Sequence, residues 1–129
     1  MDKTDRQKLG KRGEDESCAY LEKQGFTVIE RNYWKPWGEI DVIARRGDEL
    51  RFWEVKTVSR EKIGERDDDY EPEDNIHPWK RERLRRVIET YLLAHPHFDE
   101  LEWQVDAIAV YINQAGKVLK IEWLEDVEI

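Results

Sequence analysis

The chain has 129 residues, of which 39% are hydrophobic and 40% are charged, and its formal net charge at pH 7 is −8. This length fits one domain with a single core, spanning residues 1–129, and is too short for two. The high charged content is typical of a soluble protein with a thin core and excludes a membrane-embedded one.

The compartment follows from cysteine usage and from the absence of long apolar runs. A single cysteine, Cys18, excludes an internal disulfide, as is typical of the reducing cytosol, and we expect it to pack on a helix. The N-terminus has no apolar signal-peptide core, and no run approaches the length of a membrane span. We therefore expect a cytoplasmic protein with no membrane partner.

The first two predicted elements are a helix and a strand. Residues 5–24 predict a helix that ends at Gly25, although Gly10 and Gly13 weaken its start. Residues 26–32 predict the first strand, because their apolar and β-branched side chains follow directly on the glycine stop.

A β-hairpin is predicted next. Its arms are residues 38–44 and 50–56, which alternate or run apolar as strands do, and Gly47-Asp48 is the dipeptide type that closes a tight two-residue turn. The simplest register pairs Arg46 with Glu49 across that turn.

This register has a consequence for four charged side chains. It puts Asp41 opposite Glu54 and Glu39 opposite Lys56. All four side chains then share one face of the sheet, since successive side chains on a strand point to alternate sides. The neighbours Ile43 and Phe52 lie on the same predicted face, which argues against full exposure of the charges.

The second half of the chain predicts a loop, a helix and two strands. Residues 59–75 form an acidic, proline-containing loop, and residues 76–94 carry the clearest helical stripe of apolar side chains. Residues 103–112 predict a buried strand, and residues 118–124 predict a last, edge strand. The order αβββαββ indicates an α/β fold, a mixed sheet flanked by helices.

The cluster on the hairpin face predicts metal chemistry. Carboxylates such as those of Asp41 and Glu54 are costly on a partly buried face without a cation, and their hard oxygen donors suit Mg²⁺ or Mn²⁺. A neighbouring lysine, here Lys56, can orient or deprotonate an attacking water. This combination is typical of metal-assisted phosphodiester hydrolysis. Seen alone, however, Glu54 and Lys56 are also compatible with a solvated charge pair.

Several motifs, in order, resemble a known family. Asp41 followed across the hairpin by Glu54-Val55-Lys56 resembles the PD-(D/E)XK nuclease signature, without the proline before the aspartate. The other motifs are Gly10-Lys11-Arg12-Gly13-Glu14, Tyr20-Leu21 with Gly25-Phe26, Arg31-Asn32, Gly38-Glu39-Ile40-Asp41, Phe52-Trp53-Glu54-Val55-Lys56-Thr57, Lys80 and Val105-Asp106. Over roughly residues 8–112 the chain is similar to the YraN-like family of predicted endonucleases, itself similar to archaeal Holliday-junction resolvases.

The resemblance implies a restriction-endonuclease-like fold and assigns roles by position. Asp41 and Glu54 become ligands of Mg²⁺ or Mn²⁺, with the Val55 carbonyl as a third ligand. Lys56 becomes the catalytic lysine. Glu14, on the first helix, matches the acid that reaches the metal directly or through water.

The resemblance also implies weaker candidates. Glu39 and Lys80 are further candidates for the site, followed by Asp106. Gly10 and Gly13 would let the first helix approach the sheet closely and present Glu14. The segment around Trp34 and the acidic loop depart from the usual family pattern.

Basic side chains gather in two places despite a pI of about 5.0. Lys11 and Arg12 lie in a basic N-terminus, and Lys80 and Arg83 lie on the basic helix. We expect these four to contact a nucleic-acid backbone; the alternative is a solvated charged surface. The acids of residues 65–74 would either gate a nucleic-acid channel or form a solvated loop.

Tryptophans and histidines give further candidates with open alternatives. Trp34 and Trp37 either stack on unpaired or junction bases or brace the turn that they flank, and we expect Trp53, Trp103 and Trp123 to pack. The three histidines, His77, His95 and His97, lack the pattern of a zinc site and are expected at the surface.

Three functions remain open from the sequence. The first is a Mg²⁺- or Mn²⁺-dependent endonuclease acting on DNA, with branched or junction DNA implied by the resemblance alone. The second is a catalytically inactive nucleic-acid-binding or protein-interaction module on the same fold, and the third is a scaffold that uses the tryptophan surface. A homodimer would suit junction cutting, although no residue pattern requires it.

Overall fold

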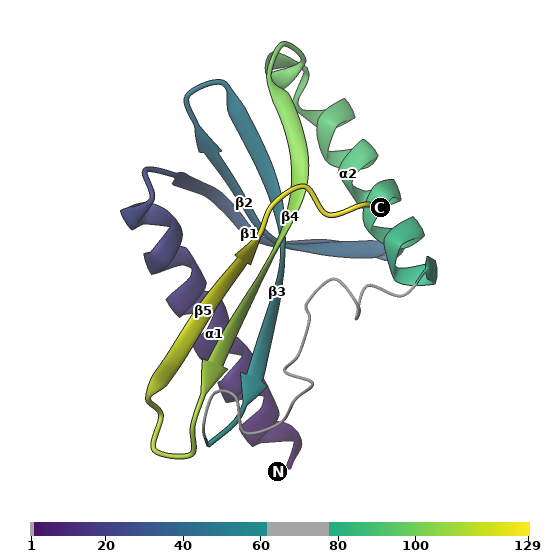
Figure 1. Ribbon diagram of the computed structural model, residues 1–129. Helices are drawn as coiled ribbons and strands as arrows, with labels where there is room; N and C mark the ends of the chain where they lie inside the picture. The colour runs from purple at the N-terminus through teal and green to yellow at the C-terminus, as the bar shows by residue number, and fades with distance from the viewer. Residues whose placement is uncertain (1, 62–77) are drawn as a thin grey trace.

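The computed structural model describes residues 2–61 and 78–129, which form a five-stranded mixed sheet with a helix against each face (Figure 1). The strands are β1 (Thr27–Lys35), β2 (Gly38–Arg46), β3 (Glu49–Ser59), β4 (Glu102–Ile112) and β5 (Val118–Leu124). The helices are α1 (Lys3–Lys23), α2 (Pro78–Ala94) and the short 3₁₀ helix η2 (Pro96–Phe98). The predicted α/β class and the order αβββαββ are therefore confirmed, and the arrangement is the restriction-endonuclease-like one.

Strand order follows the chain, β1-β2-β3-β4-β5. Among the described strands, only β3 and β4 run parallel to each other, since α2 connects them, and β5 is an edge strand as predicted. The main difference in bounds is at β1, which continues to Lys35 rather than ending at residue 32. Within residues 2–61 and 78–129, no helix combines the length and apolar character needed to cross a bilayer.

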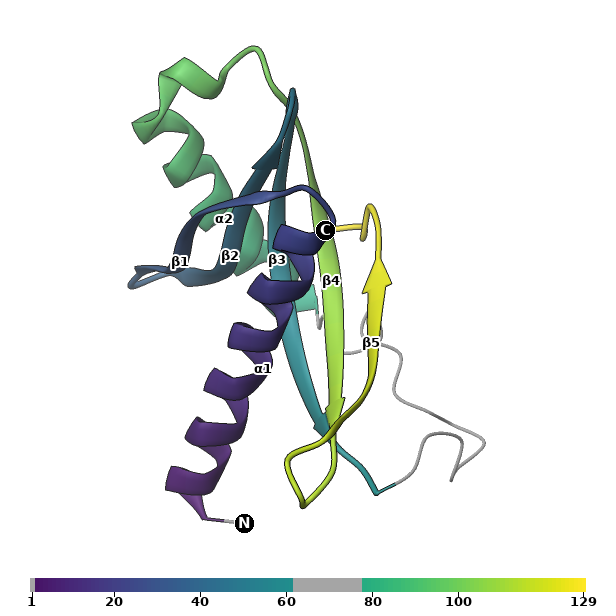
Figure 2. The same ribbon diagram turned by 90° about the vertical axis from the view of Figure 1, so that its left-hand side faces the viewer.

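The two helices cover opposite faces of the sheet (Figure 2). On one face, α2 packs Val87, Ile88 and Tyr91 against Ile43 and Phe52. On the other face, α1 packs Cys18 and Leu21 into a second cluster of buried side chains. The other members of this cluster are Phe26, Val42, Ala44, Trp53 and Ile108. Cys18 is thus a packing residue, as expected.

One glycine explains how closely α1 approaches the sheet. A Cβ atom at Gly13 would lie 1.8 Å from Oγ1 of Thr57 in β3, so no larger residue fits without displacing the helix. A Cβ atom at Gly10 would meet nothing within 4 Å. The expectation of close approach is therefore confirmed for Gly13 and wrong for Gly10, since the helix diverges from the sheet toward its N-terminus.

The hairpin register is the predicted one near the turn. Arg46 pairs with Glu49, and the ladder continues to Val42 and Trp53. Gly47 has a φ of 60°, which a two-residue hairpin turn requires at its first central position and which glycine adopts without strain. The turn thus aligns β2 with β3 for the residues that follow.

Candidate functional site

Beyond Val42 and Trp53, strands β2 and β3 separate. The ladder ends there, and Oδ2 of Asp41 accepts a hydrogen bond of 2.8 Å from the Val55 N–H. Ile40 packs in the core under α2 while Val42 packs in the core under α1, so the alternation of side chains also breaks at Asp41. The expected ladder pairs Asp41 with Glu54 and Glu39 with Lys56 are therefore wrong, because a side-chain acceptor replaces the backbone partner of Val55.

Three of these four side chains, those of Glu39, Asp41 and Glu54, nevertheless line a cleft beside the separation, whereas Lys56 does not line it. The cleft has a volume of about 420 Å³, and its lining includes the acids Glu39, Asp41 and Glu54 and the cations Lys80 and Arg83. The remaining lining residues are Trp34, Gly38, Trp79 and Leu84. The lining residues come from the end of β1, the start of β2, the middle of β3 and the first turns of α2, which Figure 1 labels.

Asp41 also lines a second cleft, on the side of α1, together with Glu14 and Val55. Asp41 therefore contributes to both clefts, one on the α2 side of the sheet and one on the α1 side. The negative charge of Glu14 reaches both Asp41 and Glu39, because it raises the pKa of each. Glu14 is thus placed near the other acids, as the resemblance implies.

The environment of Asp41 strongly favours its protonated form. Burial raises the pKa of Asp41 to about 8, the negative charge of Glu54 adds to the effect, and the hydrogen bond from Val55 opposes it. Burial also raises the pKa of Glu39, with Glu14 and Glu54 contributing. A site that disfavours its own negative charges to this extent is suited to receive a cation.

Two lysines lie beside these acids and differ in their electrostatics. Burial lowers the pKa of Lys56, and the nearby ammonium of Lys80 lowers it further against the attraction of Glu54. Lys80 forms an ion pair with Glu54, whose side chain is almost fully buried. Although burial alone would lower the pKa of Lys80, the charge of Glu54 outweighs burial and raises it. Lys56 is therefore the lysine that gives up its proton more readily.

Glu14 is held by two side chains of β1 that carried no predicted role. Its Oε1 accepts hydrogen bonds from Nδ2 of Asn32 at 3.0 Å and from Nη2 of Arg31 at 3.3 Å. Asn32 has a φ of 53°, a left-handed conformation that asparagine tolerates better than most residues. The Arg31-Asn32 motif of the sequence thus positions the acid of α1.

The four expected nucleic-acid contacts divide into two pairs. Lys80 and Arg83 line the cleft, and their contact with a nucleic-acid backbone stays a prediction. Lys11 and Arg12 do not line it; they lie exposed on α1. Each forms an ion pair with an acid one turn further along α1: Lys11 with Asp15 at 3.3 Å, and Arg12 with Glu16 at 3.0 Å.

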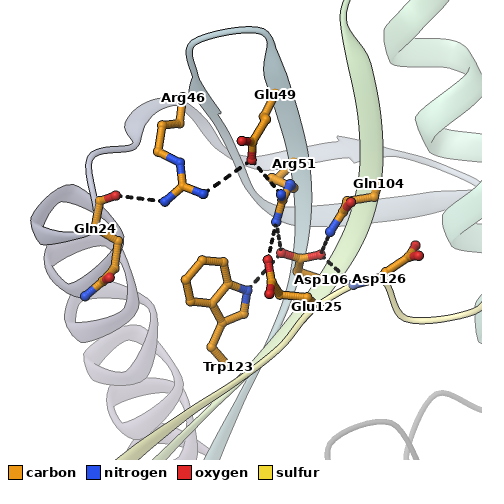
Figure 3. A network of polar contacts seen from close by, with 9 residues as sticks. All are labelled: Gln24, Arg46, Glu49, Arg51, Gln104, Asp106, Trp123, Glu125 and Asp126. Atoms are coloured by element: carbon orange, nitrogen blue, oxygen red, sulfur yellow. Dashed lines mark hydrogen bonds and ion pairs between the residues drawn. The ribbon is translucent and has the colours of Figure 1, made fainter.

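Asp106 belongs to a separate buried network and lines neither cleft (Figure 3). Its Oδ2 accepts from Nη1 of Arg51 at 2.7 Å and from Nε1 of Trp123 at 2.9 Å. Its Oδ1 accepts from Nε2 of Gln104 at 2.8 Å and from the Asp126 N–H at 2.9 Å. The Arg51 guanidinium also forms ion pairs with Glu49 and Glu125. Asp106 therefore joins β3, β4, β5 and the residues after β5.

Replacing Asp106 with alanine is expected to lower the free energy of unfolding by about 3 to 5 kcal/mol, because it leaves the buried Arg51 guanidinium without its innermost partner. The urea midpoint measures this loss. Glu125→Gln is the control: the Glu125 side chain is 59% exposed, so its pair with Arg51 should contribute no more than about 1 kcal/mol. Equal losses in the two variants would contradict this account.

The tryptophan and histidine candidates differ in how far they are exposed. Nε1 of Trp37 donates to Oγ1 of Thr90 at 3.1 Å, so Trp37 braces the turn against α2, whereas Trp34 is 65% exposed. His95 is half-buried against Tyr91 and His97 is exposed. His77 and the acidic segment 65–74 lie outside the described residues.

The chain matches one protein-family model and is similar in sequence to proteins of that family from several organisms. Residues 13–110 match the model of "Uncharacterised protein family UPF0102". A UPF0102 protein of Dictyoglomus thermophilum is 35% identical over 117 residues, which is 90% of this chain and 92% of that protein. UPF0102 proteins of Desulforamulus reducens and Desulfitobacterium hafniense are 33% and 36% identical over 94% and 95% of this chain, and over 95% and 97% of their own lengths.

The chain belongs to the UPF0102 (YraN) family. The family resemblance drawn from the sequence motifs is therefore confirmed. The part that matches the UPF0102 model contains Glu14, Asp41, Glu54, Lys56 and Lys80, so the whole charged cluster lies within it.

The donors of this UPF0102 site fit a hard divalent cation. Asp41 and Glu54 offer carboxylate oxygens in a buried setting, and Mg²⁺ typically uses one or two carboxylates and completes its shell with water and phosphate. Among residues 2–61 and 78–129, no three acidic, histidine or cysteine side chains are grouped closely enough to hold one ion together. The fit therefore rests on this pair, and the Val55 carbonyl stays a predicted third ligand.

Proposed function

We propose that this UPF0102 protein is a Mg²⁺- or Mn²⁺-dependent nuclease that hydrolyses phosphodiester bonds in DNA. One observation carries the proposal. Asp41, whose pKa is raised by burial and by Glu54, lines a cleft, and the charges of Asp41 and Glu54 act on Lys56, whose pKa is lowered by burial. Perturbed carboxylates and amines in a cleft are typical of active sites.

Each residue of the cluster has a role in this proposal. Asp41 and Glu54 bind the cation, and Glu14, held by Arg31 and Asn32, adds negative charge from the side of α1. When bound, the cation supplies Lewis-acid polarisation of the scissile phosphate. Lys56 orients the attacking water and accepts its proton at Nζ, which its lowered pKa favours.

Lys80 and Arg83 contribute at the start of α2. Both line the cleft with the acids, so the DNA phosphates meet cations next to the cation-binding carboxylates. Release of Glu54 by Lys80 would free a carboxylate oxygen for the metal and an ammonium for the phosphate. Branched DNA is the substrate that the similarity to junction resolvases favours.

A cleavage assay tests this function. Duplex, single-stranded, flap and four-way DNA are incubated with the protein and Mg²⁺, Mn²⁺ or a chelator. We expect cleavage of at least one substrate with a metal and none with the chelator. A folded protein that cuts none of the four with either metal would contradict the proposal.

One observation favours a second candidate, a non-catalytic nucleic-acid-binding module. The Lys80 ammonium forms an ion pair with Glu54, so a lysine already satisfies one of the two expected metal ligands. In such a module, Lys80 would replace the metal permanently. DNA binding that is independent of divalent ions, together with failure of the cleavage assay, would select this candidate.

A further inference from the structure

Two exposed tryptophans line the cleft that holds the acids. Trp34 is 65% exposed and Trp79 is 60% exposed. Among the described residues only three other large apolar side chains are exposed, and none of them lines this cleft: Ile29, Leu93 and Trp103. Exposed apolar surface that gathers at one cleft indicates a binding site more strongly than scattered exposure does.

The two tryptophans come from different elements that are packed tightly together. Trp34 lies near the end of β1, and Trp79 lies in the first turn of α2. A Cβ atom at Gly38 would lie 2.7 Å from the Arg83 carbonyl oxygen, so β2 and α2 are in close backbone contact beside them. Both walls of the cleft are therefore built on regular elements, which present the indoles in a defined setting.

Trp37 shows what a bracing tryptophan looks like in this protein. Its Nε1 donates to Thr90, and the Arg86 guanidinium lies 5.3 Å from its ring centre. By contrast, more than half of the surface of Trp34 and of Trp79 faces solvent in the cleft.

Charged groups surround the two indoles. Lys80 and Arg83 line the same cleft, and the Arg83 guanidinium lies 5.9 Å from the ring centre of Trp79. Aromatic faces beside cations suit a strand of nucleic acid, since bases stack on the rings and phosphates meet the cations. An apolar peptide would find little matching surface, because most other lining side chains are charged.

We propose that Trp34 and Trp79 stack on unpaired bases, so that the strand to be cut enters the cleft single-stranded. This inference rests on the proposed nuclease function and specifies its substrate class. Bases in a duplex are stacked on one another, and an indole reaches a base face only where pairing is lost. Stacking accepts every base, so the preference is for unpaired structure rather than for sequence.

The acids of the cleft predict that binding depends on a divalent ion. Glu39, Asp41 and Glu54 repel phosphate, while Lys80 and Arg83 attract it. A divalent cation held by Asp41 and Glu54 would reverse the balance toward positive charge. Ca²⁺ can supply this charge in a binding experiment in which the strand is kept intact.

Fluorescence anisotropy with a labelled oligothymidylate of about 16 nucleotides tests the inference, with a duplex of equal length as the comparison. In Ca²⁺ the wild-type protein should bind the single strand more tightly than the duplex. Trp34→Ala and Trp79→Ala should each weaken single-strand binding by about 5- to 100-fold and change duplex binding little. Trp34→Phe and Trp79→Phe should restore most of the affinity, since phenylalanine also stacks.

Trp103→Ala is the matched control, because Trp103 is 43% exposed and lies outside the cleft. Its single-strand affinity should equal that of the wild type.

Equal wild-type affinity for single strand and duplex, unchanged affinity in both cleft variants, or no oligonucleotide binding at all would overturn the inference. Single-strand binding that needs both tryptophans but is never followed by cleavage in Mg²⁺ or Mn²⁺ would remove the nuclease function alone. Cleavage of uninterrupted duplex that is insensitive to both tryptophans would remove the single-strand inference alone.

Discussion

Replacing Glu54 with glutamine, or Lys56 with methionine, is expected to slow DNA cleavage by at least about 100-fold at a metal concentration that just saturates the wild-type protein. Glutamine keeps the shape of Glu54 but loses the charge that holds the cation and forms the ion pair with Lys80. Methionine keeps the length of Lys56 without a group that can accept a proton. Single-turnover cleavage with Mn²⁺ measures both effects.

The two variants should differ in how they respond to metal and pH. Loss of Glu54 should be partly overcome by more Mn²⁺, because it weakens binding of the cation. Loss of Lys56 should not, and it should remove the rise of the rate with pH that titration of Lys56 produces below its lowered pKa. Glu100→Gln, on an exposed turn, is the control. A Lys56→Met rate within about threefold of the wild-type rate would contradict the assigned role.

Replacing Asp41 with asparagine is expected to stabilise the metal-free protein at pH 8, by at least about 2 kcal/mol. The buried Asp41 has its pKa raised to about 8, so the folded state binds a proton that the unfolded state releases near the ordinary value of 3.8. Folding stability of the wild type therefore falls as pH rises from about 4 to about 8. Asparagine can still accept the hydrogen bond from Val55 and carries no charge at any of these pH values.

Thermal unfolding in a chelator measures this difference, which should be small near pH 4 and largest near pH 8, where it corresponds to roughly 5–10 °C. Added Mn²⁺ should make the wild type the more stable of the two proteins. The ion stabilises the wild type by binding its folded state, whereas the variant lacks one of the ligands. Asp99→Asn, on the exposed surface, should show neither effect. A gain for Asp41→Asn that is equal at pH 5 and pH 8 would contradict the account.

Local signals predicted much of the fold. Gly47 carries the positive φ that the two-residue turn needs, and this turn fixed the pairing of Arg46 with Glu49. The apolar stripe of residues 76–94 predicted α2 because helical periodicity is repeated over several turns. The motif order then added the family and the arrangement of the sheet.

The geometry of the site was less predictable, because it depends on competition between distant groups. Where β2 separates from β3, the N–H of Val55 donates to the Asp41 side chain instead of to a backbone carbonyl of β2. Alternation along a strand carries no signal of that exchange. The pair of Lys80 with Glu54 joins residues 26 apart in sequence, and no short-range pattern reports it.

Two further features needed the tertiary structure. Gly10 and Gly13 look alike in sequence, and only the position of Thr57 shows that Gly13 alone is in close contact with the sheet. Exposure of Trp34 and burial of Trp53 likewise depend on which helix covers which face. Residue type predicts that a tryptophan tends to pack, and the surrounding fold decides whether it does.

The buried carboxylate of Asp106 imposes an order on how the protein forms as it is made. Arg51 and Asp106 reach their full set of partners only when Trp123, Glu125 and Asp126 are in place. Until that late stretch leaves the ribosome, strands β3 and β4 would hold a charge pair that still lacks several of its donors and acceptors. The central strands of this sheet should therefore become stably packed only after residues 123–126 have been made, and the growing chain should stay open to proteases until then.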